Sequence, residues 1–423
     1  MSAEVPWPSR LPAPVDLDDL LEPFSRRGVD LGLERLHAAL AEGGNPQERF
    51  PAVQVAGTNG KGSICTFLHA ILHSAGLRVG TYRSPHLVSW CERIQIADAW
   101  IQPQLLRDDL ARWQPIGRRH ALTPFELLTA AAFDRFAGSD LDLAILEVGL
   151  GGRLDATTAH PCRPVIGLAS IGLDHREHLG DTLAAIAFEK AGVMTQAAEV
   201  FSGPQEPQVA AVLEAEAQRR GSRLHWLEPL PEVSDGGPRL GLSGDWQRRN
   251  AAVAVAMARA LVQRGLPIAD EAIIAGLAEA RWPGRLERRL WRGRPLLLDG
   301  AHNPPAALAL AHELQGLERG LRPGRRWLLG IQRHKQAPEM LAALLRPGDQ
   351  ARIVAIPDHR CWDAGSLAAA VPELATSLES GHGGEAGMER DLDWLTAIDG
   401  ALPVVAGSLH LLGEVIPLLD RQD

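Results

Sequence analysis

A glycine-rich segment that carries a lysine, Gly57–Ser63, holds the residue types that point most directly to chemistry. The apolar run Ala52–Ala56 leads into it as an expected strand, and Gly62–Ala75 follows as an expected helix. Backbone amides in such a turn converge on a phosphate, the helix N-terminus adds its dipole, and the lysine adds a full charge. We therefore expect a phosphate site, the alternative being a glycine-rich turn with a surface lysine. The candidate phosphate-binding residues are Gly57, Thr58, Asn59, Gly60, Lys61, Gly62 and Ser63.

Lysine is scarce in this chain, since only Lys61, Lys190 and Lys335 are lysine among 43 lysine and arginine residues. A compact ammonium fits a phosphate cradle, and only an amine can be deprotonated near neutral pH and modified. Each remaining lysine is therefore a candidate for a role that arginine cannot fill. The alternative for each of the three lysines is that it remains by chance and has no special role.

An acidic residue, Glu147, stands at the end of the expected buried strand Leu143–Val148, just before three glycines within four residues. Ligands in open α/β sheets bind at the carboxyl ends of the strands. A carboxylate there can hold Mg²⁺ beside a nucleotide phosphate. The alternative is a glutamate that only caps its own loop.

Other polar residues also follow expected strands. Ser84 comes after the strand Arg78–Tyr82, and Asp174–His175 comes after the strand Val165–Ala169. Lys190 lies fifteen residues beyond His175, on the expected helix Asp181–Val193. Taken singly, each of these residues fits an ordinary turn or a solvated helix face equally well.

A second loop of this kind, Asp299–Pro304, joins the expected strand Pro295–Leu298 to the expected helix Pro304–Leu317. Asn303 can serve as the N-cap of that helix, with proline at its first position. The glycine in the loop would also allow it to close over a nucleotide. The sequence leaves both interpretations open.

Apolar runs alternate with amphipathic stretches, which predicts parallel α/β architecture. The helix Thr123–Ala137 is marked by a capping box between Thr123 and Glu126. The pattern breaks around 281–285, so we expect a P-loop ATPase-type N-terminal domain with a mainly parallel sheet over 1–284. A linker over 285–294 and a smaller Rossmann-like α/β domain over 295–423 would follow. Further expected elements are the helix Trp246–Gly265 and the strands Arg326–Gly330, Ala351–Ile356 and Pro403–Val405.

The composition is that of an ordinary globular protein, with 423 residues, 45% hydrophobic and 22% charged. The net charge of −9 gives no reason to expect nucleic acid or an anionic membrane as partner. Four widely spaced cysteines fit a reducing compartment, and neither a signal-peptide pattern nor a membrane-length apolar run is visible. We therefore expect a cytoplasmic protein, and a monomer by default.

Taken together, the motifs resemble the folylpolyglutamate synthase family, specifically its bacterial bifunctional dihydrofolate synthase/folylpolyglutamate synthase branch. The phosphate loop alone is shared with the muramyl-peptide ligases, but the other segments occur in the order of this family. The segments that carry the resemblance are 56–63 (AGTNGKGS), 84–87 (SPHL), 92–94 (ERI), 125–126 (FE), 147–157 (EVGLGGRLDAT), 170–175 (SIGLDH), 189–192 (EKAG), 282–287 (WPGRLE), 299–304 (DGAHNP) and 407–410 (GSLH).

The resemblance implies an ATP-dependent amide ligase, in which ATP phosphorylates a carboxylate and L-glutamate attacks the acyl phosphate. It implies that Lys61 and the loop amides hold the β- and γ-phosphates. It also implies two Mg²⁺ ions, a Lys190 that is carbamylated by CO₂, and activation by K⁺. The implied metal ligands are Ser84, Glu147, His175 and Lys190. Asn250, Arg285 and Asp299 would hold the nucleotide, and His302 would lie near the reacting groups.

The resemblance also implies a pteroate or folate site, and the segment Asp30–Arg35 is why we expect dihydropteroate as well as folates to be accepted. Three positions depart from the family pattern: Thr158, Arg176, and the segment 330–335, which lacks the usual aspartates and keeps only Lys335. The alternatives are a monofunctional folylpolyglutamate synthase, a muramyl-peptide-type ligase and a non-catalytic P-loop protein. The implied pteroate- or folate-binding residues are Asp30, Leu31, Gly32, Thr123, Phe125, Leu154, Asp155 and Ala156.

Overall fold

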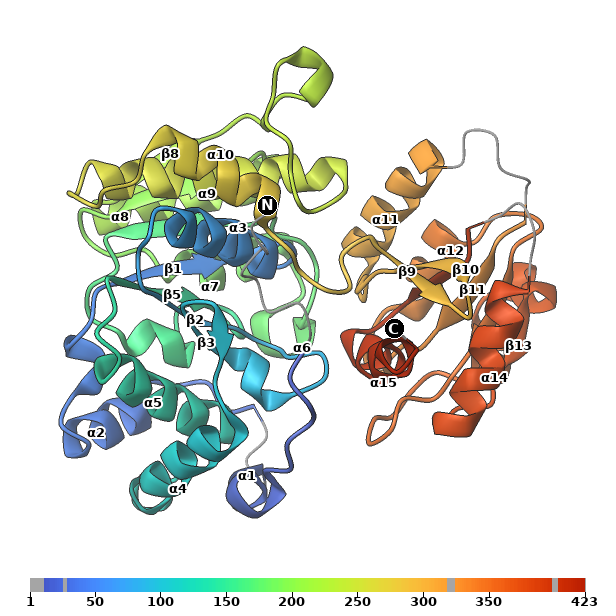
Figure 1. Ribbon diagram of the computed structural model, residues 1–423, viewed down its shortest axis with the longest axis horizontal. Helices are drawn as coiled ribbons and strands as arrows, with labels where there is room; N and C mark the ends of the chain where they lie inside the picture. Colours follow the sequence, from blue (N-terminus) through green and yellow to red (C-terminus); the bar gives the residue numbers. More distant parts are fainter. Residues whose placement is uncertain (1–10, 26–28, 318–323, 398–401, 423) are drawn as a thin grey trace, which may run out of the picture. The chain divides into compact units, whose positions relative to one another are not determined.

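The computed structural model of the chain describes residues 11–25, 29–317, 324–397 and 402–422. The chain divides into two compact units, each built around one β-sheet (Figure 1). The first unit comprises Met1–Leu242 and Trp246–Arg281, and the second comprises Ser243–Asp245 and Trp282–Asp423. No helix in the described parts of the chain is both long enough and apolar enough to cross a bilayer.

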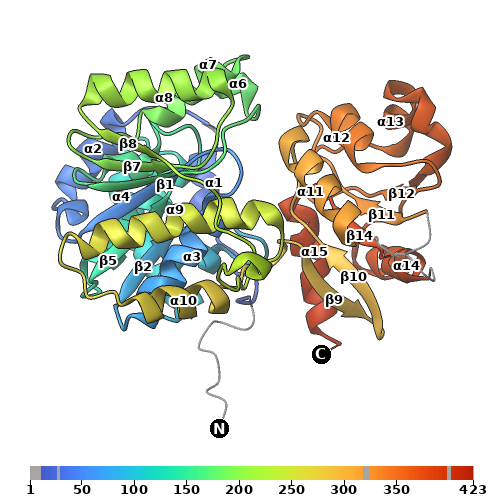
Figure 2. The same ribbon diagram turned by 90° about the horizontal axis from the view of Figure 1, so that it is seen from above.

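Six neighbouring strands in the sheet of the first unit are parallel, and two further strands at one edge add two antiparallel pairings. Helices cover both of its faces, with α3, α9 and α10 on one face and α2, α4 and α5 on the other (Figures 1 and 2). In spatial order the strands are β4 (Ala99–Trp100), β3 (Ile94–Ile96), β2 (Val79–Tyr82), β5 (Leu143–Glu147), β1 (Ala52–Ala56), β6 (Val165–Leu168), β7 (Glu199–Ser202) and β8 (Arg223–Trp226).

Helices α3, α7 and α8 each connect one parallel strand of this sheet to the next along the chain. Capping chemistry sets some of their ends: the Thr123 hydroxyl accepts the Glu126 amide at 3.2 Å, and the Glu126 carboxylate accepts the Thr123 amide at 2.7 Å. The helices are α1 (Asp18–Ser25), α2 (Glu34–Glu42), α3 (Lys61–Ser74), α4 (Pro103–Arg119), α5 (Pro124–Ala137), α6 (Arg176–Leu179), α7 (Leu183–Ala191), α8 (Pro207–Arg220), α9 (Asp245–Val262) and α10 (Asp270–Glu279), with 3₁₀ turns η1 (Pro46–Glu48), η2 (Trp90–Arg93), η3 (Ala156–Ala159) and η4 (Val233–Asp235).

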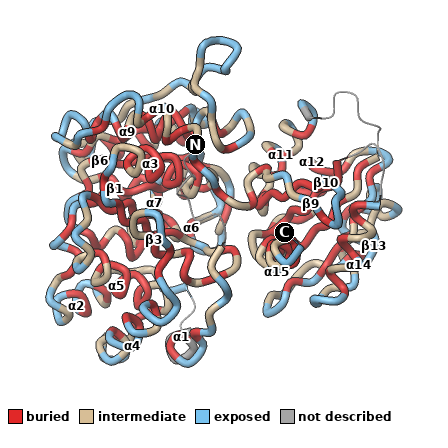
Figure 3. The backbone as a smooth tube through the Cα atoms, in the orientation of Figure 1, coloured by how far each residue is buried: buried red, intermediate tan, exposed pale blue. Residues whose placement is uncertain are grey.

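All five residues of the central strand β1 are buried, as expected for a parallel strand covered on both faces (Figure 3). One apolar cluster joins α2, α4 and α5 to strands β1, β2 and β5. A second cluster joins α7 and α8 to strands β6 and β7. The two clusters fix the strands whose carboxyl ends carry the candidate site.

The second unit has a smaller, mainly parallel sheet. In spatial order its strands are β13 (Leu378–Ser380), β12 (Gln350–Ile353), β11 (Arg326–Leu329), β14 (Val404–Ala406), β10 (Arg294–Leu298) and β9 (Glu287–Trp291). Its helices are α11 (Pro304–Leu317), α12 (Ala337–Leu344), α13 (Ala364–Ala370), α14 (Glu385–Thr396) and α15 (Leu409–Asp420), with the 3₁₀ turn η5 (Pro372–Ser377).

The structure corrects one expectation about this unit. Residues 285–294 are not a linker, because Glu287–Trp291 forms strand β9 and pairs antiparallel with β10. Its side chains alternate between partly buried and exposed until the fully buried Trp291. Because the first three residues of this edge strand are all charged, its sequence shows no alternation of apolar and polar residues, and the strand was not predicted.

Candidate active site

The glycine-rich loop needs its glycines for two separate reasons. Gly60 has φ 101°, and a Cβ there would lie 2.4 Å from Oδ1 of Asn250 on α9. Gly57 has φ 138°, and a Cβ there would lie 2.7 Å from the Cβ of Ala169. The loop thus packs directly on its neighbours, and the Lys61 Nζ folds back to donate to the Thr58 carbonyl at 3.1 Å. The structure therefore brings Asn250 beside the phosphate loop.

The start of the loop is tied to the segment that follows β6. The amides of Thr58 and Asn59 donate to the Ser170 carbonyl at 2.8 and 3.2 Å. The Thr58 hydroxyl exchanges bonds of 3.1 Å with both the carbonyl and the amide of Gly172. These contacts fix the loop relative to the segment that continues to His175. Neither Ser170 nor Gly172 was predicted from the sequence to have a role here.

Lys190 reaches the loop from helix α7. Its side chain is 4% exposed, and its Nζ donates to the Gly57 carbonyl at 2.9 Å. Burial, reinforced by the charge of Lys61, lowers the pKa of Lys190 to about 7, although Asp174 and Asp155 oppose the shift. A substantial fraction of this amine is therefore neutral near pH 7, which is the form that reacts with CO₂.

Two further expected ligands lie at neighbouring strand ends. Glu147 is 4% exposed and ends β5, where it pairs in register with Val55 of β1. Ser84 follows the end of β2, the strand on the other side of β5. Both residues are therefore at the carboxyl edge of the sheet, where a parallel α/β fold binds ligands.

His175 comes just before α6 with φ 50°, and its Nε2 lies 3.8 Å from the Asp174 carboxylate. Within the described residues, no three His, Cys, Asp or Glu side chains gather in a metal-holding group. Of the four expected metal ligands, only Glu147 and His175 are of those residue types. Lys190 would become an oxygen ligand only after carboxylation. The carboxylate, the serine hydroxyl and a modified Lys190 would suit Mg²⁺, which prefers oxygen.

The loop after β5 is organised by the Asp155 carboxylate. It accepts hydrogen bonds from the amides of Gly149, Leu150 and Thr157 at 2.9–3.0 Å and from the Thr157 hydroxyl at 2.5 Å. Burial raises the pKa of Asp155, and these hydrogen bonds act in the opposite direction. Asp155 was expected to contact pteroate, but its carboxylate is 2% exposed and committed to its own loop. Ala156 is also buried, so Leu154 is the accessible one of the three expected residues 154–156.

The Asp30–Arg35 segment is attached to the start of α5. Arg35 forms an ion pair with Asp30 at 2.8 Å and another with Glu126 at 3.2 Å. The Arg35–Glu126 pair was not predicted from the sequence. Leu31 and Gly32 of this segment are both partly exposed.

Phe125 lies over the loop that follows β5. A Cβ on Gly149 would be 2.5 Å from its Cζ, and its ring centroid is 6.0 Å from that of Tyr82. Thr123, expected at the same site, is 5% exposed and acts as the N-cap of α5. Phe125 thus packs on the loop that contains Gly149, whereas Thr123 caps α5, the helix to which Phe125 belongs.

In the second unit, the residues expected to hold nucleotide lie together. The Asp299 carboxylate accepts the amides of Leu286 and Ala301 at 3.0 and 2.9 Å, and burial raises its pKa. A Cβ on Gly300 would lie 2.3 Å from Nη1 of Arg285. Arg285 and Asp299 are therefore neighbours.

The rest of this loop is shaped by local hydrogen bonds. The His302 Nδ1 lies 2.7 Å from the Gly300 carbonyl. The Asn303 Oδ1 accepts the Ala306 amide at 3.0 Å, so this side chain is the N-cap of α11. The structure thus gives Asn303 the capping role that the sequence left open.

The residues that depart from the family pattern have structural roles. Thr158 donates to the Gly152 carbonyl at 2.7 Å and accepts from Gln54 at 3.0 Å, so it braces the loop after β5. Arg176 forms an exposed ion pair with Asp181. In the segment 330–335, Gln332 lies 3.0 Å from the His359 ring nitrogen.

The fold and the loop define a class: a P-loop nucleotide-binding α/β protein with a second, Rossmann-like unit. A family model described as dihydrofolate synthetase, C-terminal domain, matches residues 286–418. The dihydrofolate synthetase of Saccharomyces cerevisiae is 32% identical over 420 residues, covering 92% of this chain and 97% of that protein. The dihydrofolate synthase/folylpolyglutamate synthase of Bacillus subtilis is 35% identical over 323 residues, covering 68% and 73%.

A solved structure gives the same result. The bifunctional folylpolyglutamate synthase/dihydrofolate synthase of Yersinia pestis, complexed with AMPPNP and Mn ion, has a TM-score of 0.82 and 30% identity, covering 97% of this chain and all of that one. The chain belongs to the dihydrofolate synthetase/folylpolyglutamate synthase family. It is accordingly an ATP-dependent ligase that uses a divalent metal.

Proposed function

We propose that this enzyme joins L-glutamate to dihydropteroate, forming dihydrofolate, and to the γ-carboxylate of folates, forming polyglutamates. A carboxylate oxygen of the acceptor attacks the γ-phosphorus of ATP, ADP leaves, and an acyl phosphate results. The glutamate amine then attacks the acyl carbon, loses a proton and displaces inorganic phosphate. The observation that carries this proposal is the meeting of Lys190 with the phosphate loop at Gly57, one strand away from Glu147.

Within this proposal, Lys61 and the loop amides orient the β- and γ-phosphates and offset their charge. Ser84, Glu147, His175 and a carbamylated Lys190 would hold two Mg²⁺ ions. The bound metal would supply charge neutralisation during phosphoryl transfer. Asn250, Arg285 and Asp299 are proposed to hold the nucleotide, and His302 to lie near the reacting groups.

Carbamylation of Lys190 is part of the proposal and follows from its chemistry. The neutral amine attacks CO₂, an N–C bond forms, and the nitrogen loses a proton, which leaves a carboxylate-like group. This group would be an oxygen ligand at a position where the unmodified chain presents an ammonium. Arginine could not take this role, and the chain retains lysine here although it uses arginine at most cationic positions.

For the acceptor, we propose a site formed by the Asp30–Gly32 segment, Phe125 and Leu154. Arg35 connects the segment to α5, and Phe125 lies over Gly149 of the loop that contains Leu154. An aromatic ring suits the flat heterocycle of a pterin. Thr123, Asp155 and Ala156 would then position these groups without contacting the ligand.

A second candidate function is glutamate addition to dihydropteroate alone. It is favoured by the match of 286–418 to a dihydrofolate synthetase model, together with the lost aspartates of the segment 330–335. A cytoplasmic monomer activated by K⁺ completes the proposal for either function.

The test is ADP release by purified protein with Mg²⁺, K⁺ and L-glutamate, comparing 7,8-dihydropteroate with tetrahydrofolate and identifying the products by mass. Turnover of both acceptors supports the bifunctional proposal. Turnover of dihydropteroate alone supports the second candidate, and turnover of tetrahydrofolate alone would indicate a folylpolyglutamate synthase. If no ADP is released with either acceptor, the proposed function is overturned.

A further inference from the structure

The loop after β5 lies directly against the C-terminal end of α7, the helix that carries Lys190. A Cβ on Gly192 would be 2.3 Å from the Cβ of Arg153, and one on Gly152 would be 2.8 Å from the Lys190 carbonyl oxygen. Real Cβ atoms do not approach other atoms so closely, so this contact depends on both glycines. Arg153 is therefore held at the point where helix and loop touch.

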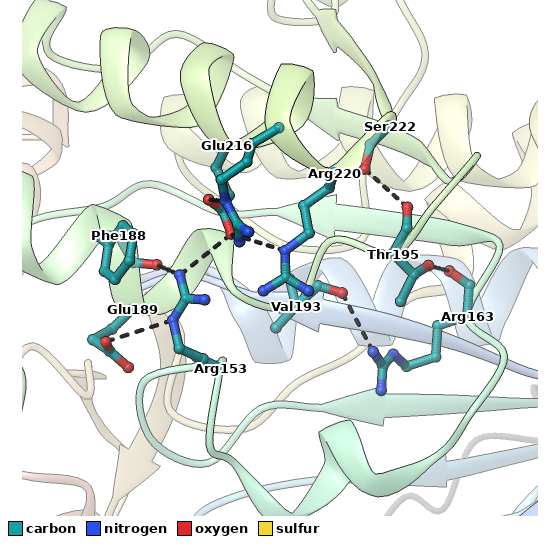
Figure 4. Close-up of polar contacts among 10 residues, drawn as sticks. Arg153, Arg163, Phe188, Glu189, Val193, Thr195, Glu216, Arg220 and Ser222 are labelled. Atoms are coloured by element: carbon teal, nitrogen blue, oxygen red, sulfur yellow. Dashed lines mark hydrogen bonds and ion pairs between the residues drawn. The ribbon is translucent and has the colours of Figure 1, made fainter.

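Arg153 binds this helix end through its backbone and its side chain, and Figure 4 shows the side-chain contacts. Its amide donates to the Glu189 carbonyl at 2.8 Å, and its Nη2 donates to the Phe188 carbonyl at 3.0 Å. Its guanidinium carbon lies 4.0 Å from the centroid of the Phe188 ring, and its Nε lies 3.7 Å from the Glu189 carboxylate. A cation that caps the last carbonyls of a helix also interacts favourably with the helix dipole.

The guanidinium of Arg153 is anchored from behind by Glu216 of α8. Glu216 is 3% exposed, and its Oε1 lies 3.3 Å from Nη2 of Arg153. Arg219 and Arg220 donate to the same carboxylate at 2.6–2.9 Å. A buried carboxylate with three guanidinium partners is a rigid anchor, because each partner limits its rotation.

A second arginine holds the chain just beyond the helix. Arg163 is 4% exposed and donates to the carbonyls of Thr158 and His160. It also donates to the carbonyl of Val193 (Figure 4). It thereby joins the chain that follows the loop to the chain that follows α7. Arg153 thus connects the loop to the end of α7, and Arg163 connects the residues that follow the loop to the residues that follow α7.

We propose that Arg153, anchored by Glu216, is a positioning residue that sets Lys190 against the phosphate loop; this inference rests on the proposed function of Lys190. Arg153 grips residues 188 and 189, which immediately precede Lys190, and it belongs to the loop that starts after Glu147. It therefore fixes the distance between Glu147, at the end of a strand, and Lys190, on a helix, which are two of the residues proposed to bind Mg²⁺. Within the described parts of the chain, its hydrogen bonds and ion pairs are to Phe188, Glu189 and Glu216, none of which is assigned to the phosphate loop or the nucleotide.

The test replaces Arg153 with glutamine and measures how fast an amine-specific acylating reagent modifies each lysine, by mass spectrometry of peptides. The chain contains only three lysines, so the readout is simple. We expect labelling of Lys190 to rise at least severalfold, while labelling of Lys335 stays unchanged. We also expect kcat to fall and the Mg²⁺ concentration for half-maximal activity to rise, with KM for ATP unchanged. The matched control is Arg119→Gln, which removes a guanidinium from an exposed ion pair with Glu42 and should leave labelling, kcat, the Mg²⁺ dependence and KM for ATP unchanged.

Glu216→Gln is a second variant, which retains the Arg153 residue but weakens its anchor. It should shift the same readouts in the same direction by a smaller factor. Wild-type labelling of Lys190 and wild-type Mg²⁺ dependence in a folded Arg153→Gln protein would overturn the inference. If Arg153→Gln does not fold, wild-type behaviour of Glu216→Gln would overturn it instead. Failure of the proposed function is seen separately, as absence of turnover by the wild-type enzyme, and does not affect the labelling result.

Discussion

The ammonium group of Lys190 donates a hydrogen bond of 2.9 Å to the carbonyl oxygen of Gly57, a residue 133 positions earlier in the chain. This contact joins the helix after β6 to the loop after β1, and it places an almost fully buried amine beside the expected phosphate site. Burial removes the water that would stabilise its charge, so the amine can react near neutral pH.

Replacing Lys190 by arginine should reduce kcat by about 100-fold or more, because arginine keeps the positive charge but cannot form a carbamate. The measurement is steady-state turnover under saturating CO₂ and Mg²⁺. The reverse swap at an exposed position, Arg119→Lys, is the control and should leave turnover unchanged. Near-wild-type turnover of Lys190→Arg would exclude the carbamate.

The pH dependence of stability should also report on Lys190 when CO₂ and metal are withheld. The folded-state pKa of about 7 is lower than the usual 10.5, so between these values the unfolded chain binds more protons than the folded one. Stability should therefore rise with pH, by about 2 kcal/mol between pH 7 and 9 from this residue alone. Denaturant unfolding of wild type and Lys190→Met at both pH values measures the difference. An equal pH dependence in both proteins would contradict the assignment.

Replacing Lys61 by alanine should lower kcat by about 100-fold and raise KM for ATP, because the γ-phosphate loses a full positive charge nearby. Stability should change little, since within the described parts of the chain its ammonium donates to the carbonyl of Thr58 in the same loop. Kinetics and thermal unfolding of the same preparation separate the two effects. Unchanged kcat and KM would remove Lys61 from the site.

Gly60→Ala should destabilise the protein by roughly 1–3 kcal/mol, because φ is 101° and the new methyl would meet Asn250 Oδ1 at 2.4 Å. In the double variant Gly60→Ala/Asn250→Gly, the Asn250 side chain that meets the new methyl is absent. This variant should recover part of the stability but none of the activity. Denaturant unfolding of all four proteins in the cycle gives the coupling. Purely additive effects would show that the two residues are not in contact.

Phe125→Ala should raise KM for the pteroate or folate acceptor while leaving KM for ATP unchanged. The ring lies over Gly149 on the proposed acceptor side, and its loss removes a flat apolar surface. Separate titrations of the acceptor and of ATP distinguish the two. An increase confined to KM for ATP would place Phe125 on the nucleotide side.

Elements with strong local signals were predicted well. The capping box of α5 and strand β1 are where the sequence indicated, because hydrogen bonds within one turn and a continuous apolar run decide them. Strand β9 was missed, because an edge strand rich in arginine has no apolar run. A local pattern is therefore sufficient only where local interactions dominate.

The candidate site shows the same division. The positions of Glu147 and Lys190 could be predicted from their motifs, but the contact of Lys190 with Gly57 depends on how α7 packs. Asp155 was assigned to ligand, whereas the fold turns its carboxylate into its own loop. The anchor Glu216 has no motif around it, and although Arg219 and Arg220 are its local partners on α8, Arg153 reaches it only when α8 meets the loop after β5. Such contacts between distant segments cannot be read from spacing.

The most direct test of the central claim follows one oxygen atom. Dihydropteroate labelled with ¹⁸O in its carboxylate is incubated with the enzyme, ATP, Mg²⁺ and L-glutamate, and the inorganic phosphate is analysed by mass. An acyl-phosphate ligase transfers one carboxylate oxygen to the phosphate that leaves, so one ¹⁸O per phosphate is the predicted result. Phosphate without ¹⁸O, released together with dihydrofolate, would contradict the proposed reaction.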